Sequence, residues 1–177
     1  RLFAPDLLRS HVKRITMCGD VGDPIYASEF LDIIKYLKST SPDLHIFVIT
    51  NGSHRKPDWW SSLAGLLNHR DTINFSVDGF DHNTNILYRR GSDWDSIMQG
   101  MSIMCTRSDA FVNWASIVFR FNQDHLDGIM QQAHHIGCDG MQFTHSTKFG
   151  SKYGGAYQGF EDPLEPRAEF VSDTHRY

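Results

Sequence analysis

The stretch Val12-Lys-Arg-Ile-Thr-Met-Cys18-Gly19-Asp20-Val-Gly22-Asp23-Pro24 decides how the rest of the chain is interpreted. Its first half is rich in apolar and β-branched residues and predicts a strand, whereas its second half combines glycine, aspartate and proline and predicts a turn. Apolar residues at helical spacing follow between Glu29 and Leu37. The predicted turn therefore lies at the carboxyl end of the strand. Ligands of parallel α/β folds bind at the carboxyl edge of the sheet, because helix N-termini and free backbone amides gather there.

The same strand, turn and helix pattern recurs along the chain. It predicts strands at 12–18, 44–50, 73–79, 111–122 and 141–145, and helices at 28–39, from 57 onward, at 94–104 and at 124–136. Residues 2–11 read as the end of a helix, and 80–92 as a loop. The nearly continuous apolar run at 44–50 favours a strand buried on both faces. We therefore expect an α/β fold with about five parallel strands, which could curve into part of a (βα) barrel.

Composition narrows the classes of partner. The net charge of −4 and the pI near 6.2 give no general attraction to nucleic acid or anionic membranes. No apolar run reaches the roughly 18 residues of a membrane span. The three scattered cysteines favour a reducing compartment, so we expect a cytoplasmic protein. The first residues lack a methionine and resemble the end of a helix, which suggests a piece of a longer chain.

Three predicted turns carry residues suited to a small ligand. The first contains Gly19 and Gly22, whose backbone could approach a ligand closely, and the second contains Asn51. In the third, Ser76 and Asp78 are two residues apart, so both side chains would point to one face of a strand and could grip ribose hydroxyls. Ordinary tight turns and backbone capping by aspartate are the open alternatives.

Other polar residues are weaker candidates. Arg120 could pair with a ligand carboxylate, or instead with a neighbouring acid. The ten histidines show no metal-binding spacing, because the adjacent pair His134 and His135 diverge on a helix and no HxxxH or HExxH motif occurs. The residues alone therefore predict no metal site.

The ordered turns together resemble those of the radical S-adenosylmethionine (radical SAM) enzymes, specifically the group with "GGEP", "TNG" and "S-x-DG" turns. The resemblance covers residues 1–147 and rests on the motifs Cys18 to Pro24, Thr50-Asn51-Gly52, Phe75-Ser76-Val-Asp78-Gly79, and Tyr88-Arg89 followed by Trp94. It implies a partial (βα)6 barrel over 1–147, with 148–177 as a Gly-, Pro- and aromatic-rich extension. Gly-Asp-Pro stands where Gly-Glu-Pro is usual.

The resemblance also implies roles for individual residues. The first turn would meet the methionyl amine of S-adenosylmethionine (AdoMet), through Gly19, Asp20, Gly22, Asp23 and Pro24. Asn51 belongs to the matching second turn, and Ser76 and Asp78 would face the ribose or the reacting centre. Asn113 or Arg120 would hold the methionyl carboxylate.

The sequence departs from this family in one important respect. These enzymes bind a [4Fe–4S] cluster through a CxxxCxxC loop after the first strand, and no such loop occurs here. When the motifs are aligned with those of the family, the first βα unit would lie upstream of residue 1. Three thiolates must converge on a cluster, so the dispersed cysteines cannot replace the loop. We therefore expect the full-length parent to use AdoMet and [4Fe–4S] to make a 5′-deoxyadenosyl radical, and this chain alone to hold no cofactor and be inactive.

The missing unit also predicts an exposed strand edge. Such edges recruit another chain, so a homo-oligomer paired near Val12 to Met17 is expected. Relatives with these turns often modify peptides or proteins, which makes a peptide one candidate substrate. The competing interpretation is a non-catalytic small-molecule-binding or scaffold barrel that has lost the cluster. A doubly wound nucleotide-binding domain is disfavoured, since neither G-x-G-x-x-G nor a phosphate loop appears.

Overall fold

A computed structural model describes residues 4–19, 22–146, 149 and 162–170. One sheet runs through it in the order β1-β2-β3-β4-β5, and every neighbouring pair is parallel. The strands are β1 (Arg14–Met17), β2 (His45–Thr50), β3 (Thr72–Ser76), β4 (Phe111–Ile117) and β5 (Gly140–Thr144). The predicted α/β fold with five parallel strands is therefore confirmed.

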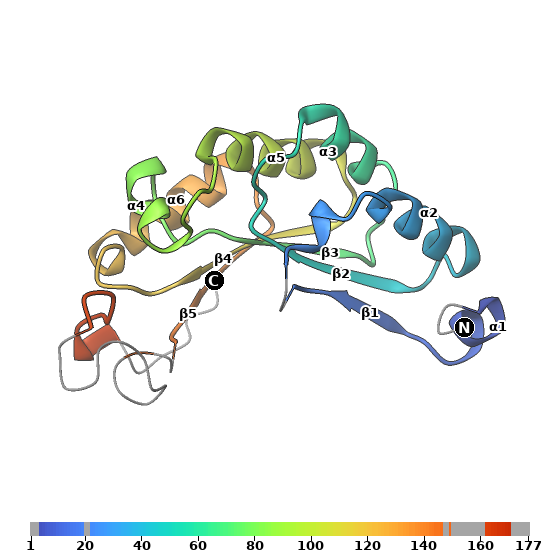
Figure 1. The fold of residues 1–177 in the computed structure, drawn as a ribbon, viewed down its shortest axis with the longest axis horizontal. Coiled ribbons are helices and arrows are strands. Elements are labelled where there is room, and N and C mark those ends of the chain that lie inside the picture. Colours follow the sequence, from blue (N-terminus) through green and yellow to red (C-terminus); the bar gives the residue numbers. More distant parts are fainter. Residues whose placement is uncertain (1–3, 20–21, 147–148, 150–161, 171–177) are drawn as a thin grey trace.

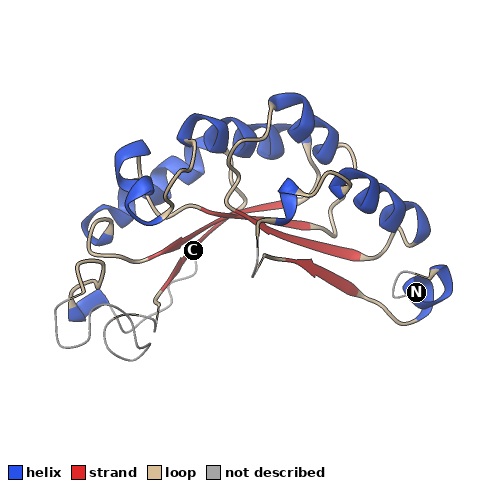
Figure 2. Ribbon diagram, in the orientation of Figure 1, coloured by secondary structure: helices blue, strands red, loops and turns tan. Residues whose placement is uncertain are grey.

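Helices alternate with the strands (Figures 1 and 2). The α-helices are α1 (Pro5–Ser10), α2 (Phe30–Thr40), α3 (Pro57–Ala64), α4 (His82–Tyr88), α5 (Trp94–Arg107) and α6 (Leu126–Ile136). Short 3-10 turns are η1 (Pro24–Tyr26), η2 (Gln123–His125) and η4 (Ala168–Phe170). None of the helices within the described ranges is long and apolar enough to cross a membrane.

The helices cover only one face of the sheet. Figure 1 shows α2, α3, α5 and α6 arched over one side, and in the described part of the chain no helix lies across the other side of β2 to β4. Along β2, Ile46 and Val48 are fully buried under the helices, whereas His45, Phe47 and Ile49 are half-buried on the opposite, open face. The prediction that 44–50 is buried on both faces was therefore wrong, because one face has no helical cover.

Two further local predictions need correction. The segment predicted as a loop at 80–92 contains α4, which a capping box stabilises: the Asp81 carboxylate accepts from the Thr84 amide, and the Thr84 hydroxyl accepts from the Asp81 amide. The strand predicted to reach residue 122 ends at Ile117. The Asn122 side chain ends it, since it bonds the Ile117 carbonyl and the Phe119 amide and forces a turn.

β1 is an outer strand of the described sheet, because only β2 pairs with it there. Assembly of two copies through this edge stays a prediction. The described part of the predicted extension, 162–170, contacts the segment that follows β4: the Leu164 carbonyl accepts from the Arg120 amide, and the Gln123 side chain accepts from the Arg167 amide. The proposed division at residue 147 also stays a prediction.

Candidate functional site

The first two turns are joined by the Asp23 carboxylate. Because all strands are parallel, their carboxyl ends share one edge of the sheet, which we call the rim. The Asp23 carboxylate accepts from the Thr50 hydroxyl at 3.0 Å and from the Asn51 amide at 2.5 Å, both at the end of β2. It also accepts from the Ile25 amide at 3.2 Å and so caps η1. One aspartate thereby fixes the turn after β1 against the turn after β2.

The turn after β1 has no room for a side chain at Gly19. A Cβ built there would lie 1.4 Å from the Gly22 carbonyl oxygen. Glycine is required at Gly19 because the backbone folds back on itself at that point, which fits the alternative of an ordinary tight turn, and a close approach to a ligand stays a prediction.

Asn51 links the second turn to η1. Its side-chain oxygen accepts from the Ser53 amide at 2.9 Å and from the Tyr26 hydroxyl at 3.2 Å. Burial raises the pKa of the Tyr26 phenol, and the nearby Asp23 carboxylate acts in the same direction. Tyr26 therefore stays protonated at neutral pH and keeps its hydroxyl as a donor.

Asp78 joins the ends of β3 and β4. Its carboxylate is fully buried and forms an ion pair with Arg89, with 2.7 Å between Oδ2 and Nε. The other oxygen accepts from the Ile117 amide at 2.7 Å. Burial raises the pKa of Asp78, while the charge of Arg89 and the Ile117 hydrogen bond oppose that rise. Both carboxylate oxygens therefore bond groups of the protein, and the ion pair positions Arg89.

Two buried asparagines hold this arrangement in place. The Asn122 side-chain amide donates to the carbonyls of Asp78 at 2.7 Å and Ile117 at 2.8 Å. The Asn85 side-chain oxygen accepts from the amides of Asp78 and Gly79, each at 3.1 Å. A Cβ at Gly79 would lie 2.2 Å from the Asn85 amide nitrogen, so this turn also needs glycine. Buried hydrogen bonds thus hold the ends of β3 and β4 to each other.

A cavity of about 580 Å³ opens at the rim. It lies between the turn after β2 and the loop after α4. Two hydrogen bonds join these segments: the His54 ring bonds the Gly91 carbonyl at 2.9 Å, and the Asp93 amide donates to the Ser53 hydroxyl at 2.7 Å. The lining residues are Tyr26, Asn51, Ser53, His54, Tyr88, Arg89, Arg90, Gly91 and Ser92. We call this space the rim cavity.

Arg89 brings a partly free guanidinium to the rim cavity. Its side chain is 24% exposed, and its Nε donates to the Asp78 carboxylate. Among the described residues, no acceptor bonds its two terminal nitrogens. Those nitrogens can donate a paired hydrogen bond to a carboxylate or phosphate.

Most of the sequence-predicted site residues lie at the rim, but among the described ones only Asn51 lines the rim cavity. Gly19, Gly22, Asp23 and Pro24 follow β1, and Asn51 follows β2. Ser76 ends β3 and Asp78 lies just beyond it. Asp20 lies outside the described residues.

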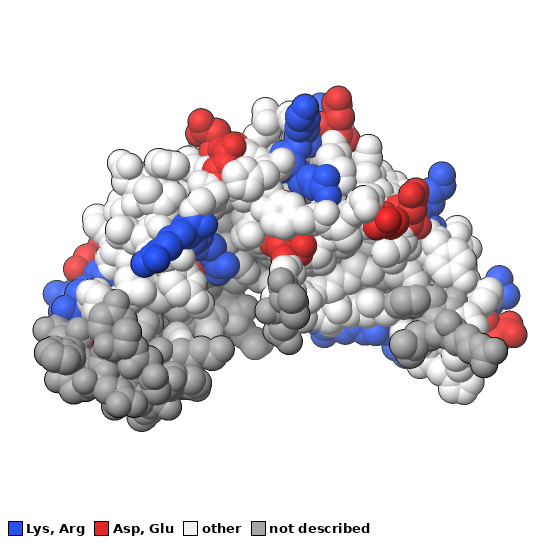
Figure 3. Space-filling view, viewed as in Figure 1, with Lys and Arg blue, Asp and Glu red and all other residues white. Residues whose placement is uncertain are grey.

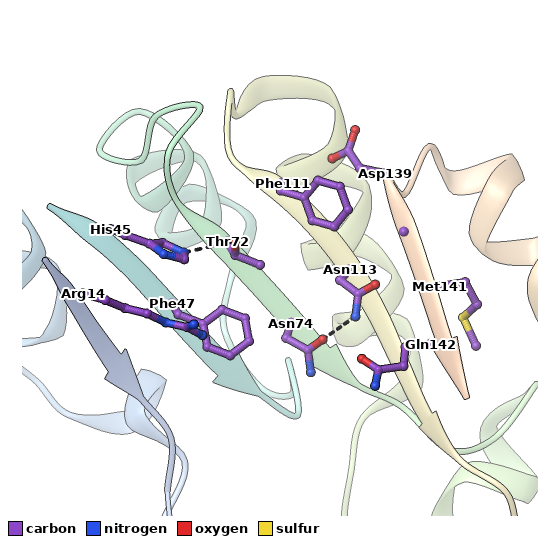
Figure 4. Close-up of a pocket in the computed structure, with 11 residues that line it drawn as sticks. Arg14, His45, Phe47, Thr72, Asn74, Phe111, Asn113, Asp139, Met141 and Gln142 are labelled. Atoms are coloured by element: carbon purple, nitrogen blue, oxygen red, sulfur yellow. Dashed lines mark hydrogen bonds between the residues drawn. The ribbon is translucent and has the colours of Figure 1, made fainter. Parts of the chain in front are cut away.

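Asn113 is not brought together with the rim residues. It lies on the open face, where its side-chain amide donates to Asn74 across the β3–β4 pair (Figure 4). It lines a second cavity of about 460 Å³ at the opposite edge of the sheet, where the first residues of all five strands meet. The remaining lining residues are Arg14, His45, Phe47, Thr72, Asn74, Phe111, Asp139, Gly140, Met141 and Gln142.

Arg120 is also separate from the rim cavity. It follows β4 and is held by the C-terminal segment, since its Nε donates to the Glu165 carbonyl at 2.9 Å. The structure therefore gives neither Asn113 nor Arg120 a place in the lining of the rim cavity.

Sequence reasoning missed Arg89, Tyr26 and Asn122 as parts of the site. The resemblance includes Arg89 without giving it a role, and the signal that could reveal one is its pairing with a buried acid at a strand end. Tyr26 lies in the short turn after Pro24, where no periodic pattern marks it. Asn122 was read as a residue within a strand, which hid its function as the turn-forming amide.

The described residues contain no group of three or more His, Cys, Asp or Glu side chains able to hold a metal ion. Acidic and basic side chains are interspersed on the face shown in Figure 3 rather than segregated by sign. The rim cavity instead offers hydrogen-bonding side chains, the aromatic rings of Tyr26 and Tyr88, and the ion pair of Arg89 with the buried Asp78.

Comparison with known proteins shows that the fold is similar to that of solved radical SAM enzymes. The protein resembles SuiB of Streptococcus suis (TM-score 0.62, 11% identity, 84% of this chain and 31% of that one). It also resembles anSMEcpe with bound AdoMet (TM-score 0.61, 14% identity, 87% and 44%) and TYW1 with a lysine-pyruvate adduct bound (TM-score 0.55, 16% identity, 76% and 42%). The chain spans less than half the length of these structures. No protein-family model and no curated protein sequence matches it.

The bridging role of Asp23 predicts a specific loss of stability. In Asp23→Asn, an amide NH₂ replaces one of the two oxygens that accept from Ile25, Thr50 and Asn51, so a donor faces a donor. We expect unfolding in urea to show a loss of about 1–3 kcal/mol.

The matched control is Asp109→Asn, because Asp109 is exposed in the loop before β4 and should change stability by less than about 0.5 kcal/mol. Equal effects of the two substitutions would show that Asp23 does not bridge the turns.

Proposed function

We propose that this chain is the AdoMet-holding part of a radical SAM enzyme and that the rim cavity receives the cofactor. The observation that carries the proposal is a cavity of about 580 Å³ at the rim, which is lined by Tyr26 of η1, the turn after β2 and the loop after α4. Solved structures with the same fold, SuiB and anSMEcpe, are known with AdoMet bound. The low identity to them makes the ligand a proposal for this chain.

The chemistry of the cavity suits the parts of AdoMet. The terminal nitrogens of Arg89 would take the methionyl carboxylate as a paired hydrogen bond. The rings of Tyr26 and Tyr88, each nearly half exposed, would stack on the adenine. The backbone carbonyls of the turn containing Gly19 and Gly22, which lies at the same rim outside the lining of the cavity, would accept from the methionyl ammonium. When bound beside a reduced [4Fe–4S] cluster, AdoMet supplies a 5′-deoxyadenosyl radical for hydrogen abstraction.

Asp78 has a positioning role in this proposal. Its buried carboxylate already bonds Arg89 and Ile117, which leaves it little capacity for a ribose hydroxyl. It holds the guanidinium of Arg89 at a fixed point of the cavity wall. Ser76, half-buried at the end of β3, and Asn51 remain the proposed contacts to hydroxyl groups.

The cluster does not fit the described residues. Cys105 and Cys138 lie on the helical side of the sheet, Cys18 stands alone and exposed after β1, and no third thiol joins any pair of them. We propose that the cluster loop belongs to the remainder of a longer parent protein. Anaerobic reconstitution of this chain with iron and sulfide should give no [4Fe–4S] signal in absorbance or EPR spectra. A stoichiometric cluster would overturn this assignment.

The proposal also includes the class of substrate, which is a peptide. One matched structure, anSMEcpe, is known with AdoMet and a peptide together, and this supports a peptide as the substrate of the parent enzyme. The alternative of a non-catalytic scaffold barrel predicts the same cavity without a cluster loop in the parent. An in-frame CxxxCxxC segment preceding Arg1 in the parent gene would favour the enzyme, and its absence would favour the scaffold.

AdoMet binding to the isolated chain tests the proposed site. We expect weak binding in calorimetry, with a Kd of roughly 1 mM, because the cluster that would anchor the amine and carboxylate is not provided. Arg89→Lys keeps the positive charge that pairs with Asp78 but loses the planar guanidinium group with its two terminal nitrogens. It should weaken AdoMet binding by about fivefold or more, since a paired hydrogen bond to the carboxylate is lost.

The matched control is Arg70→Lys, at an exposed ion pair with Asp43 outside the rim cavity, which should bind AdoMet as the unchanged protein does. Circular dichroism and thermal melting should show both variants folded. AdoMet binding that is unaffected by Arg89→Lys would remove Arg89 from the site, and no binding at millimolar AdoMet would refute the proposed cavity.

A further inference from the structure

Two of the three cysteines meet on the helical side of the sheet, away from the rim. Cys105 lies in the last turn of α5, and Cys138 follows the end of α6. Their sulfur atoms are 3.9 Å apart although the residues are separated by 33 positions in the sequence. Both side chains are half-buried, so small oxidants and reductants can reach them.

The backbone around Cys138 is fixed in the position that brings the thiols together. Gly137 adopts the left-handed conformation, with φ of 95°, and ends α6. The Cys138 amide donates to the Ala133 carbonyl at 3.0 Å, and the next residue, Asp139, exchanges two hydrogen bonds with Val112 of β4. A Cβ at Gly137 would lie 3.6 Å from the Cβ of Cys105, so the two backbones approach closely.

The two thiols are not equivalent. Hydrogen bonding with Cys138 lowers the pKa of Cys105, whereas the same contact and burial raise the pKa of Cys138. The close contact therefore favours ionisation of one thiol while the other keeps its proton. The arrangement of an ionisable thiol beside a resolving thiol is typical of redox-sensitive pairs.

We propose that Cys105 and Cys138 form a reversible disulfide that clamps the end of α5 to the connection between α6 and β5. Closing the bond requires the sulfur atoms to move from 3.9 Å to roughly 2.05 Å, which side-chain rotation and a small backbone shift can supply. The third cysteine, Cys18, is exposed after β1 and does not take part.

The oxidation is balanced with a peroxide as the oxidant. The Cys105 thiolate attacks one oxygen of hydrogen peroxide, the O–O bond breaks, and hydroxide leaves and takes up a proton as water. The sulfur of Cys138 attacks the resulting sulfenic acid, the S–S bond forms, and the proton of Cys138 leaves with the hydroxyl group as a second water molecule. The two thiols together lose two electrons, and the peroxide gains them. A dithiol reductant reverses the step.

The test is peroxide treatment of the 177-residue chain, followed by alkylation and tryptic mass spectrometry. We expect one cross-link, between the tryptic peptides 91–107 and 121–148, with the mass of the pair reduced by two hydrogen atoms. The Cys18→Ser variant should form it equally, whereas Cys105→Ser and Cys138→Ser should not. The cross-linked chain should melt at a temperature higher by roughly 5–15 °C, and dithiothreitol should reverse the shift.

Three results would overturn the proposal. The first is that both thiols remain open to alkylation at a peroxide concentration that oxidises Cys18. The second is that the cross-link joins Cys18 to another cysteine instead. The third is a cross-link between Cys105 and Cys138 that leaves the melting temperature unchanged, because the pair would then be oxidisable without acting as a clamp.

Discussion

Two aspartate carboxylates, those of Asp23 and Asp78, hold the strand ends at the rim of this sheet together. Each accepts hydrogen bonds from the end of a neighbouring strand: Asp23 reaches from the turn after β1 to the end of β2, and Asp78 reaches from the end of β3 to the end of β4. Carboxylates can do this because each offers two oxygens and several lone pairs to backbone amides whose own strand has ended. The bridges fix the positions of the turn after β2 and of Arg89, both of which contribute to the wall of the rim cavity.

The one-sided cover of the sheet gives the molecule two different surfaces. The helical face buries an apolar core that includes Ile46, Phe75 and Trp114. The open face carries half-buried polar side chains such as Asn74, Asn113 and Gln142, which suit contact with water or with further protein better than a sealed core. The rim lies between these surfaces, where a ligand can reach both the backbone turns and the aromatic rings.

Periodic features could be predicted from the sequence, but contacts could not. The alternation of strands and helices gave the parallel sheet, and the turns containing Gly22, Asn51 and Asp78 were correctly assigned to one edge because parallel strands end together. The role of Arg89 depends on the burial of Asp78, which no local pattern shows. Asn113 and Arg120 stand out as polar residues in an apolar run, yet Asn113 lies near the start of β4, far from the rim, and Arg120 follows β4 but donates to the Glu165 carbonyl.

The most direct test of the account is a titration of the isotope-labelled chain with AdoMet, followed by amide chemical shifts. The account predicts that the largest changes occur at the rim, in the turns around Gly22, Asn51 and Asp78 and in the loop containing Gly91. Amides at the opposite edge of the sheet, including Asn113 and Gln142, should change little. Shifts concentrated at that opposite edge, or none at millimolar AdoMet, would contradict the claim that the bridged turns form the cofactor site.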